Sequence, residues 1–209
     1  YSDYADYDDD SCEYASTQTI SAIQQNMGDA DDGTLNGTPV EVYGIVTAVF
    51  GSSAAIQDGE GAWSGIFLYQ GGGFGAAQGD SVMVAGTVGS YNGGTQISVA
   101  DVTVLNSGNT LPTASVVSTL DAASEAYEGV LCRVTASITG EPDSYGQFIV
   151  DDGTGPVIAD DLGYDAYAGA AAALGETYRI TGPVYGSFGN SLEPRDADDF
   201  QKLGCTNSG

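Results

Sequence analysis

The sequence predicts an all-β fold with short helices, arranged as two tandem five-stranded barrels. The chain has 209 residues, enough for two small domains, and 42% hydrophobic residues, enough to fill a core in each. Three segments of the first half recur in order in the second: residues 44–51, 57–69 and 79–94 match residues 132–140, 151–161 and 175–190. Such a repeat indicates two copies of one structural unit.

Strands are predicted where apolar and polar residues alternate. Alternate residues of two matching segments share one face: Val82, Val84, Gly86 and Val88 in the first copy, and Tyr178, Ile180, Gly182 and Val184 in the second. The intervening Thr177, Arg179 and Thr181 are expected to point outward. Asp58-Gly59 and Asp152-Gly153 are hairpin signals, so each is expected to join the second strand of its copy to the third.

Three short helices are predicted. Residues 16–28 and 116–124 each precede the first strand of a copy and are expected to be brief helices. Residues 164–176 contain an alanine run that ends in glycine, which predicts a short helix between the third and fourth strands of the second copy. The first copy has the glycine-rich residues 71–80 at this point and is expected to form a loop. A helix in that place is typical of the OB-fold, a five-stranded barrel.

The domain plan follows from these elements, with a Gly-, Asn-, Ser- and Pro-rich linker between the copies. The predicted segments are an acidic, Tyr-rich arm (1–15), a first OB-fold-like domain (16–106), a linker (107–115), a second OB-fold-like domain (116–203) and a tail (204–209).

The charge excludes several classes of function. The chain has 29 Asp and Glu, 4 Lys and Arg and no His, for a net charge of −25. Nucleic acid is therefore an unlikely partner, because phosphate binding relies on cationic side chains, unless divalent cations mediate. Without His there is no Ser-His-Asp triad and no His-ligated zinc. The chain is rich in carboxylate oxygens, which bind hard cations, so calcium (Ca2+) is the possible cofactor.

The three cysteines differ in their surroundings. Cys132 lies in an alternating strand pattern and is expected to be a buried thiol. Cys12 and Cys205 lie in polar sequence near opposite ends of the chain. We predict a disulfide between them, either within one chain or between neighbouring subunits, in an oxidising compartment.

The chain is expected to be secreted, extracellular or at the cell surface. It begins without Met and without a signal peptide, which is typical of a processed mature form. No apolar run approaches the ~20 residues of a membrane span. Adaptation to salt would produce a similar composition, and that alternative stays open.

Several segments resemble OB-fold modules of secreted bacterial proteins. They are "TISAIQQ", "VEVYGIVTAVF", "IQDGEGAWSGIFLY", "GDSVMVAGTV" and "LEPRDADDF", within residues 16–203. Such modules often precede the catalytic domain of extracellular nucleases of the endonuclease/exonuclease/phosphatase type. The resemblance implies OB-fold barrels and an extracellular location. It does not imply nuclease activity, because the chain has no catalytic domain and lacks the histidines that this domain would need.

Two acidic groups are candidate calcium ligands. Asp29, Asp31, Asp32 and Asn36 could wrap an ion in one loop, although their spacing is not that of an EF-hand. Asp151, Asp152, Asp160 and Asp161 flank the hairpin of the second copy, and their mutual repulsion would be relieved by a cation. The alternative for both groups is a solvated loop. Arg195 is expected to pair with a nearby carboxylate and to close the second barrel.

Aromatic residues offer a second kind of site. A platform for single-stranded nucleic acid needs a basic groove, which four cationic residues cannot supply. A sugar-binding surface needs no positive charge and could use Trp63 and Tyr91. Phe67 is expected in the core, and Phe188 at the surface.

These observations lead to two hypotheses. Tyr1, Tyr4 and Tyr7 recur among aspartates in the arm, which either docks on a neighbouring subunit or is a solvated tail. The first hypothesis is a secreted, non-enzymatic structural protein that assembles with other copies of itself into a calcium-stabilised filament or surface layer. The alternative is an extracellular ligand-binding module, for glycan or cation-bridged nucleic acid, that acts beside a separate enzyme. Paired carboxylates could serve a glycosidase, but nothing in the sequence defines a cleft.

Overall fold

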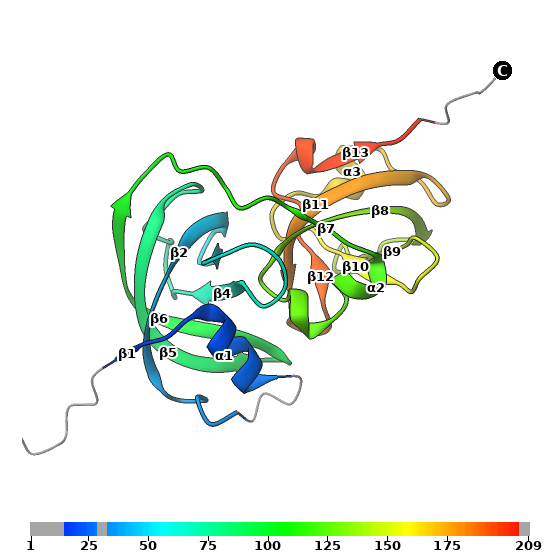
Figure 1. Cartoon of the computed structure of the whole chain (residues 1–209). Coiled ribbons are helices and arrows are strands. Elements are labelled where there is room, and N and C mark those ends of the chain that lie inside the picture. The colour runs from blue at the N-terminus through cyan, green and yellow to red at the C-terminus, as the bar shows by residue number, and fades with distance from the viewer. Residues whose placement is uncertain (1–14, 29–32, 205–209) are drawn as a thin grey trace, which may run out of the picture.

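The computed structural model describes residues 15–28 and 33–204. Several predicted site residues lie outside the described residues: Tyr1, Tyr4, Tyr7, Cys12, Asp29, Asp31, Asp32 and Cys205. The described residues form two barrels that lie side by side (Figure 1). No helix among them is both long and apolar enough to cross a membrane.

The first barrel is a closed ring of five strands. Its elements are β1 (Ser16–Thr17), α1 (Ile20–Met27), β2 (Pro39–Phe50), β3 (Ser53–Gln57), β4 (Gly65–Tyr69), β5 (Ser81–Tyr91) and β6 (Gly94–Asn106). The bonded order is β2-β3-β4-β6-β5, and β5 pairs again with β2. Within the ring, β4 and β6 are parallel and the other neighbours are antiparallel.

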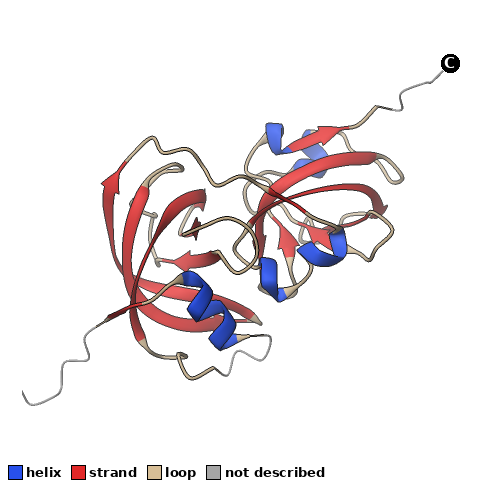
Figure 2. Ribbon diagram, in the orientation of Figure 1, coloured by secondary structure: helices blue, strands red, loops and turns tan. Residues whose placement is uncertain are grey.

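The second barrel repeats this ring. Its elements are β7 (Ser115–Val116), α2 (Thr119–Ala122), η1 (Glu125–Tyr127), β8 (Leu131–Gly140), β9 (Phe148–Asp151), β10 (Val157–Ala159), α3 (Ala166–Gly169), β11 (Thr177–Tyr185), β12 (Ser191–Leu192), η2 (Ala197–Asp199) and β13 (Phe200–Lys202). The order β8-β9-β10-β12-β11 closes where β11 pairs with β8, and β10 and β12 are parallel. The predicted fold class is therefore confirmed: two tandem OB-fold barrels with short helices (Figure 2).

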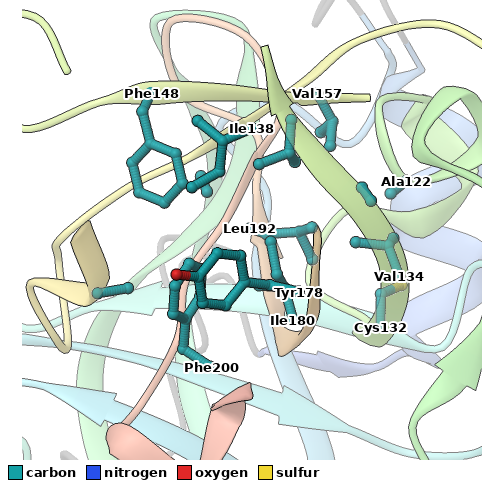
Figure 3. Packing of buried hydrophobic residues seen from close by; sticks show 14 of the residues in the cluster. Ala122, Cys132, Val134, Ile138, Phe148, Val157, Tyr178, Ile180, Leu192 and Phe200 are labelled. Carbon is teal, nitrogen blue, oxygen red and sulfur yellow. The ribbon is translucent and has the colours of Figure 1, made fainter. Parts of the chain in front are cut away.

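Each barrel has its own apolar core. The first contains Ile56, Ile66 and Leu68 of the β3–β4 hairpin, packed against Ile20 and Ile23 of α1. In the second, Tyr178 stacks on Phe200 with ring centroids 4.3 Å apart, and Phe148 meets Phe200 edge to face (Figure 3). The predicted inward faces of β5 and β11 are both buried. Thr181 was expected to point to solvent but is buried, because the Arg133 side chain lies over it and donates a hydrogen bond to its hydroxyl at 3.1 Å.

The helices agree with the sequence in place but not always in length. Thr19 caps α1 by accepting a hydrogen bond from the Ala22 amide at 3.1 Å. α3 is shorter than the alanine run predicts, because Ala171 adopts a left-handed φ of 48° and the chain turns back toward β11. Residues 71–80 of the first copy contain no helix or strand, as expected.

The second barrel packs against the outer face of β3 and β4, which we call the covered face. The residues of this face alternate with core residues along each strand: Ala55 and Phe67 point outward, and both are buried. Phe67 contacts Tyr185 of β11 with ring centroids 4.5 Å apart. Phe67 is buried in a core cluster, as expected, and this cluster lies where the two barrels meet.

Polar groups also join the two barrels. The buried Gln57 side chain accepts a hydrogen bond from the Leu131 amide at 2.7 Å. The backbone amide of Trp63 donates to the Ala126 carbonyl at 2.6 Å. Arg195 pairs with Asp199, as predicted, and also donates to the Thr47 carbonyl of the first barrel at 3.2 Å. These polar groups are therefore satisfied by partners across the interface.

Glycines allow the two backbones to touch. A Cβ atom added to Gly65 would overlap the backbone of Gly129, and one added to Gly129 would overlap the backbone of Gly65 and Ile66. A Cβ atom on Gly94 would lie 2.8 Å from the carbonyl carbon of Gly186. These positions need glycine because the obstructing atoms are backbone and cannot rotate away.

We predict that Gly65→Ala lowers the free energy of unfolding by about 1–3 kcal/mol, the usual cost of overpacking. Urea unfolding measures the loss. Gly71→Ala is the matched control, since a Cβ atom there meets nothing within 4 Å. Equal stability of the two variants would show that the barrels do not approach as closely as described.

Candidate functional site

OB-folds bind ligands on the outer face of their second and third strands and on two loops, between strands one and two and between strands four and five. In the first barrel the second and third strands are β3 and β4, whose outer face is covered by the second barrel. Its two loops are also tight turns, at Gly51-Ser52 and Asn92-Gly93. On the first barrel only the edge of this surface remains open, where Ser53, Tyr69 and Tyr91 line a small pocket.

In the second barrel the two equivalent loops enclose a hollow. A pocket of about 540 Å³ lies between its two loops, within the usual size range of ligand sites. The β8–β9 loop (residues 141–147) and the β11–β12 loop (residues 186–190) form its walls, together with the chain that follows β10. The lining residues are Asp143, Tyr145, Gln147, Asp160, Asp161, Leu162 and Phe188. We call it the loop pocket.

The β8–β9 loop is folded around one carboxylate. Asp143 accepts hydrogen bonds from the backbone amides of Tyr145, at 2.7 Å, and Gln147, at 3.2 Å. This turn holds the Tyr145 side chain out, 78% exposed. The Gln147 side chain donates to Asp160 at 2.8 Å and so ties the loop to the end of β10.

Phe188 forms the opposite wall in a strained conformation. Its φ is 59°, in the left-handed region that bulky residues avoid, and its side chain is 72% exposed. The first barrel holds it there: the Phe188 amide donates to the Asn92 carbonyl at 2.9 Å, and its ring meets Tyr91 edge to face at 6.2 Å. An exposed aromatic ring kept in a strained backbone is a feature of functional sites.

The loop pocket is acidic. Burial raises the pKa of Asp161 above its ordinary value, and the charges of Asp160, Asp165 and Asp143 raise it further. All four Lys and Arg residues lie in the described part of the chain, and none of them lines the pocket. The pocket therefore offers hydrogen-bond acceptors and aromatic rings and repels anions.

A buried carboxyl group lies behind these aspartates. Burial raises the pKa of Glu193 to about 8, and the charges of Asp160 and Asp161 act in the same direction, whereas a hydrogen bond from Ser191 at 2.6 Å acts against them. Burial raises the pKa of Tyr185 as well, and the charges of Glu193 and Glu128 act in the same direction. Glu193 is therefore mostly protonated at neutral pH.

The four aspartates of the second hairpin do not form one site. In the β9–β10 register, Phe148 pairs with Ala159 and Val150 with Val157, so Asp151 and Asp152 lie at one end of the hairpin and Asp160 and Asp161 at the other. Among the described residues, no group of three or more Asp, Glu, Cys or His residues is placed to hold a metal ion. The expectation that the hairpin brings all four together was wrong, because antiparallel strands separate residues at their opposite ends.

Asp151 and Asp152 have structural roles instead. Asp151 accepts from the Gly153 amide at 2.7 Å. Asp152 accepts from the Thr154 hydroxyl at 2.6 Å and from the Thr119 hydroxyl at 2.8 Å at the start of α2. These hydrogen bonds, that from Thr154 foremost, lower the pKa of Asp152 to about 2.

The remaining predicted residues are also separate. Tyr91 lines a smaller pocket of about 260 Å³ with Tyr69 and Tyr185. Trp63 is half-buried and lines a different hollow beside η1, so the two residues do not form one stacking surface. Asn36 lies in an exposed turn before β2.

Tyr145, which lines the loop pocket, is not among the site residues predicted from the sequence. One signal in the sequence points to it. The segments that match the first and second strands are farther apart in the second copy than in the first, so the second copy has an insertion in the β8–β9 loop.

Comparisons with known proteins add little beyond the fold. No protein-family model and no curated protein matches the chain. Fission yeast Pot1 with ssDNA is 12% identical, covering 90% of this chain and 88% of that chain, with a TM-score of 0.39. A murine DNA binding protein bound with ds DNA is 8% identical, covering 74% and 92%, with a TM-score of 0.38. The OBody AM1L10 bound to hen egg-white lysozyme is 18% identical, covering 47% and 99%, with a TM-score of 0.32. Likenesses this distant carry no argument about a ligand.

We predict that stability falls as pH rises because Glu193 is buried. Its folded pKa of about 8 lies above its ordinary 4.5, so the folded state holds a proton that the unfolded state releases between these values. In this window the free energy of unfolding falls by on the order of 1 kcal/mol per pH unit, and above pH 8 the loss is complete.

Glu193→Gln keeps the shape of the side chain and cannot ionise. The gain in its free energy of unfolding over the wild type should therefore be absent near pH 4 and largest near pH 9. Urea unfolding at pH 4, 7 and 9 measures it. Asp196→Asn, at an exposed position, is the control. Parallel pH profiles for wild type and Glu193→Gln would contradict the assignment.

Proposed function

We propose that the protein is a secreted, non-enzymatic glycan-binding module and that the loop pocket of the second barrel is its site. One observation supports this above the others: the first barrel has the centre of its ligand surface covered, whereas the second barrel has a hollow between its two ligand loops. The secreted location rests on the composition and on the resemblance to modules of secreted proteins.

The chemistry of the pocket suits a sugar without negative charge. Tyr145 and Phe188 present exposed rings on which the C–H face of a sugar ring can stack. Asp143, Asp160 and Asp161 offer carboxylate oxygens, which accept strong hydrogen bonds from hydroxyl groups. The same carboxylates repel phosphates, so nucleic acid would need bridging cations.

Binding is tested by calorimetry with neutral oligosaccharides: the hexamers of β-1,4-glucose, α-1,4-glucose and β-1,4-N-acetylglucosamine. We expect at least one to bind, and neither an oligogalacturonate nor single-stranded DNA to do so in the absence of divalent cations. Absence of binding by all three hexamers, or preference for the anionic probes, would overturn the proposal.

Tyr145→Ala should weaken binding of the preferred hexamer about tenfold, because one aromatic contact contributes about 1.4 kcal/mol. The ring is exposed, so the unfolding temperature should not change. Tyr43→Ala removes an exposed ring from the first barrel, outside the loop pocket, and should bind as the wild type does. Equal losses in both variants would show that the pocket is not the site.

A structural role in an extracellular assembly is the second proposal. It is favoured by the hydrogen bonds and the apolar contact that join the two barrels. A subunit with a net charge of −25 repels its own copies, so assembly would need divalent cations such as calcium between subunits. The residues expected to lock neighbours, Cys12 and the arm tyrosines, lie outside the described residues.

Electron microscopy of the native protein tests this second proposal. We expect fibres in calcium that disperse after chelation, and weaker fibres for Cys12→Ser. Separate particles under both conditions would contradict assembly. Fibres that persist after chelation would support assembly and contradict a role for calcium in it.

A further inference from the structure

We infer that the binding site continues from the loop pocket across the Phe188–Tyr91 contact onto the first barrel, so that the ligand is a sugar chain that occupies both barrels at once. The inference rests on the proposed glycan-binding function. It assigns a second subsite to the pocket of Tyr69, Tyr91 and Tyr185, here called the tyrosine pocket.

The tyrosine pocket has the composition of a sugar subsite. Three tyrosines line it together with Ser53 and Gln96, and it contains no charged side chain. Tyr69 and Tyr91 are 47% and 51% exposed, so their rings are open to a ligand. Hydroxyl and amide groups beside aromatic faces suit a neutral polyhydroxylated ligand better than an ion or an apolar one.

The two pockets are separated by a single aromatic ridge. Phe188 is a wall of the loop pocket, Tyr91 is a wall of the tyrosine pocket, and their rings are in contact at 6.2 Å. The backbones below are joined as well, by the hydrogen bond from the Phe188 amide to Asn92 and by the close approach of Gly94 to Gly186. The ridge is therefore fixed, and both of its flanks are hollow.

The ridge has a strained backbone and exposed aromatic rings. Phe188 and Asn92 both have left-handed backbones, with φ of 59° and 50°. Such a conformation is unfavourable for Phe, and apolar rings gain nothing by exposure to water. A ligand that covers the ridge as it passes from one pocket to the other would bury both rings. A monosaccharide in the loop pocket would leave Tyr91 uncovered.

The test compares chain lengths in calorimetry, using dimers, tetramers and hexamers of the three neutral series named above. We expect the affinity to rise at least about tenfold from dimer to hexamer, equivalent to about 1.4 kcal/mol. Tyr69→Ala should weaken hexamer binding about fivefold or more and leave dimer binding unchanged, while Tyr145→Ala weakens both. Tyr91→Ala should weaken hexamer binding at least as much as Tyr69→Ala does.

Tyr91→Phe keeps the ring against Phe188 and should retain most of the hexamer affinity. The Tyr69 ring does not pair with Phe188 or Tyr91, so Tyr69→Ala should leave Phe188 in place. A loss of hexamer affinity in this variant would therefore report the loss of the subsite. Unchanged unfolding temperatures would show that both alanine variants fold.

The outcomes distinguish the two proposals. If dimers and hexamers bind equally, and Tyr69→Ala and Tyr91→Ala bind as the wild type does while Tyr145→Ala does not, the extended site is wrong and the loop pocket stands alone. If no oligosaccharide of any length binds, the proposed function fails, and the extended site fails with it.

Discussion

The packing of the second barrel on the outer strand face of the first determines the rest of the structure. The contact is apolar at its centre, where Phe67 meets Tyr185, and the backbones approach at Gly65 and Gly129. Burial of this apolar surface supplies the driving force, and Gln57 satisfies its own polar groups and the Leu131 amide inside the contact. A shift of one barrel against the other would separate the rings and leave that amide unpaired.

This contact also makes the two similar barrels differ in how much of their ligand-binding surface is exposed. On the first barrel it covers the centre of the surface with which OB-folds bind, and the short turns of that barrel leave room for the approach. The longer loops of the second barrel extend past the contact, and Asn92 of the first barrel holds Phe188 in place. The first barrel thus supports the loop pocket of the second barrel, and it contributes Tyr91 and Tyr69 to the neighbouring pocket.

The fold could be predicted from the sequence because it depends on local patterns: alternation along β5 and β11, Asp-Gly turns after β3 and β9, and a helix before each first strand. The site could not, because it depends on pairings between distant residues. The register of β9 and β10 separates Asp151 from Asp160, and only the approach of the barrels brings Phe188 to Tyr91. The acidity of the chain was visible, but which aspartates face a pocket depends on loop geometry.

Hydroxyl-radical footprinting of the native protein, read by mass spectrometry, tests the covered face most directly. Phe67 and Phe188 are residues of one type and equal intrinsic reactivity, and they are 1% and 72% exposed. Slow oxidation of Phe67 and fast oxidation of Phe188 is the predicted result. Oxidation of Phe67 at the rate of Phe188 would mean that the barrels are apart in solution, and the inequality of the two ligand surfaces would then have no structural basis.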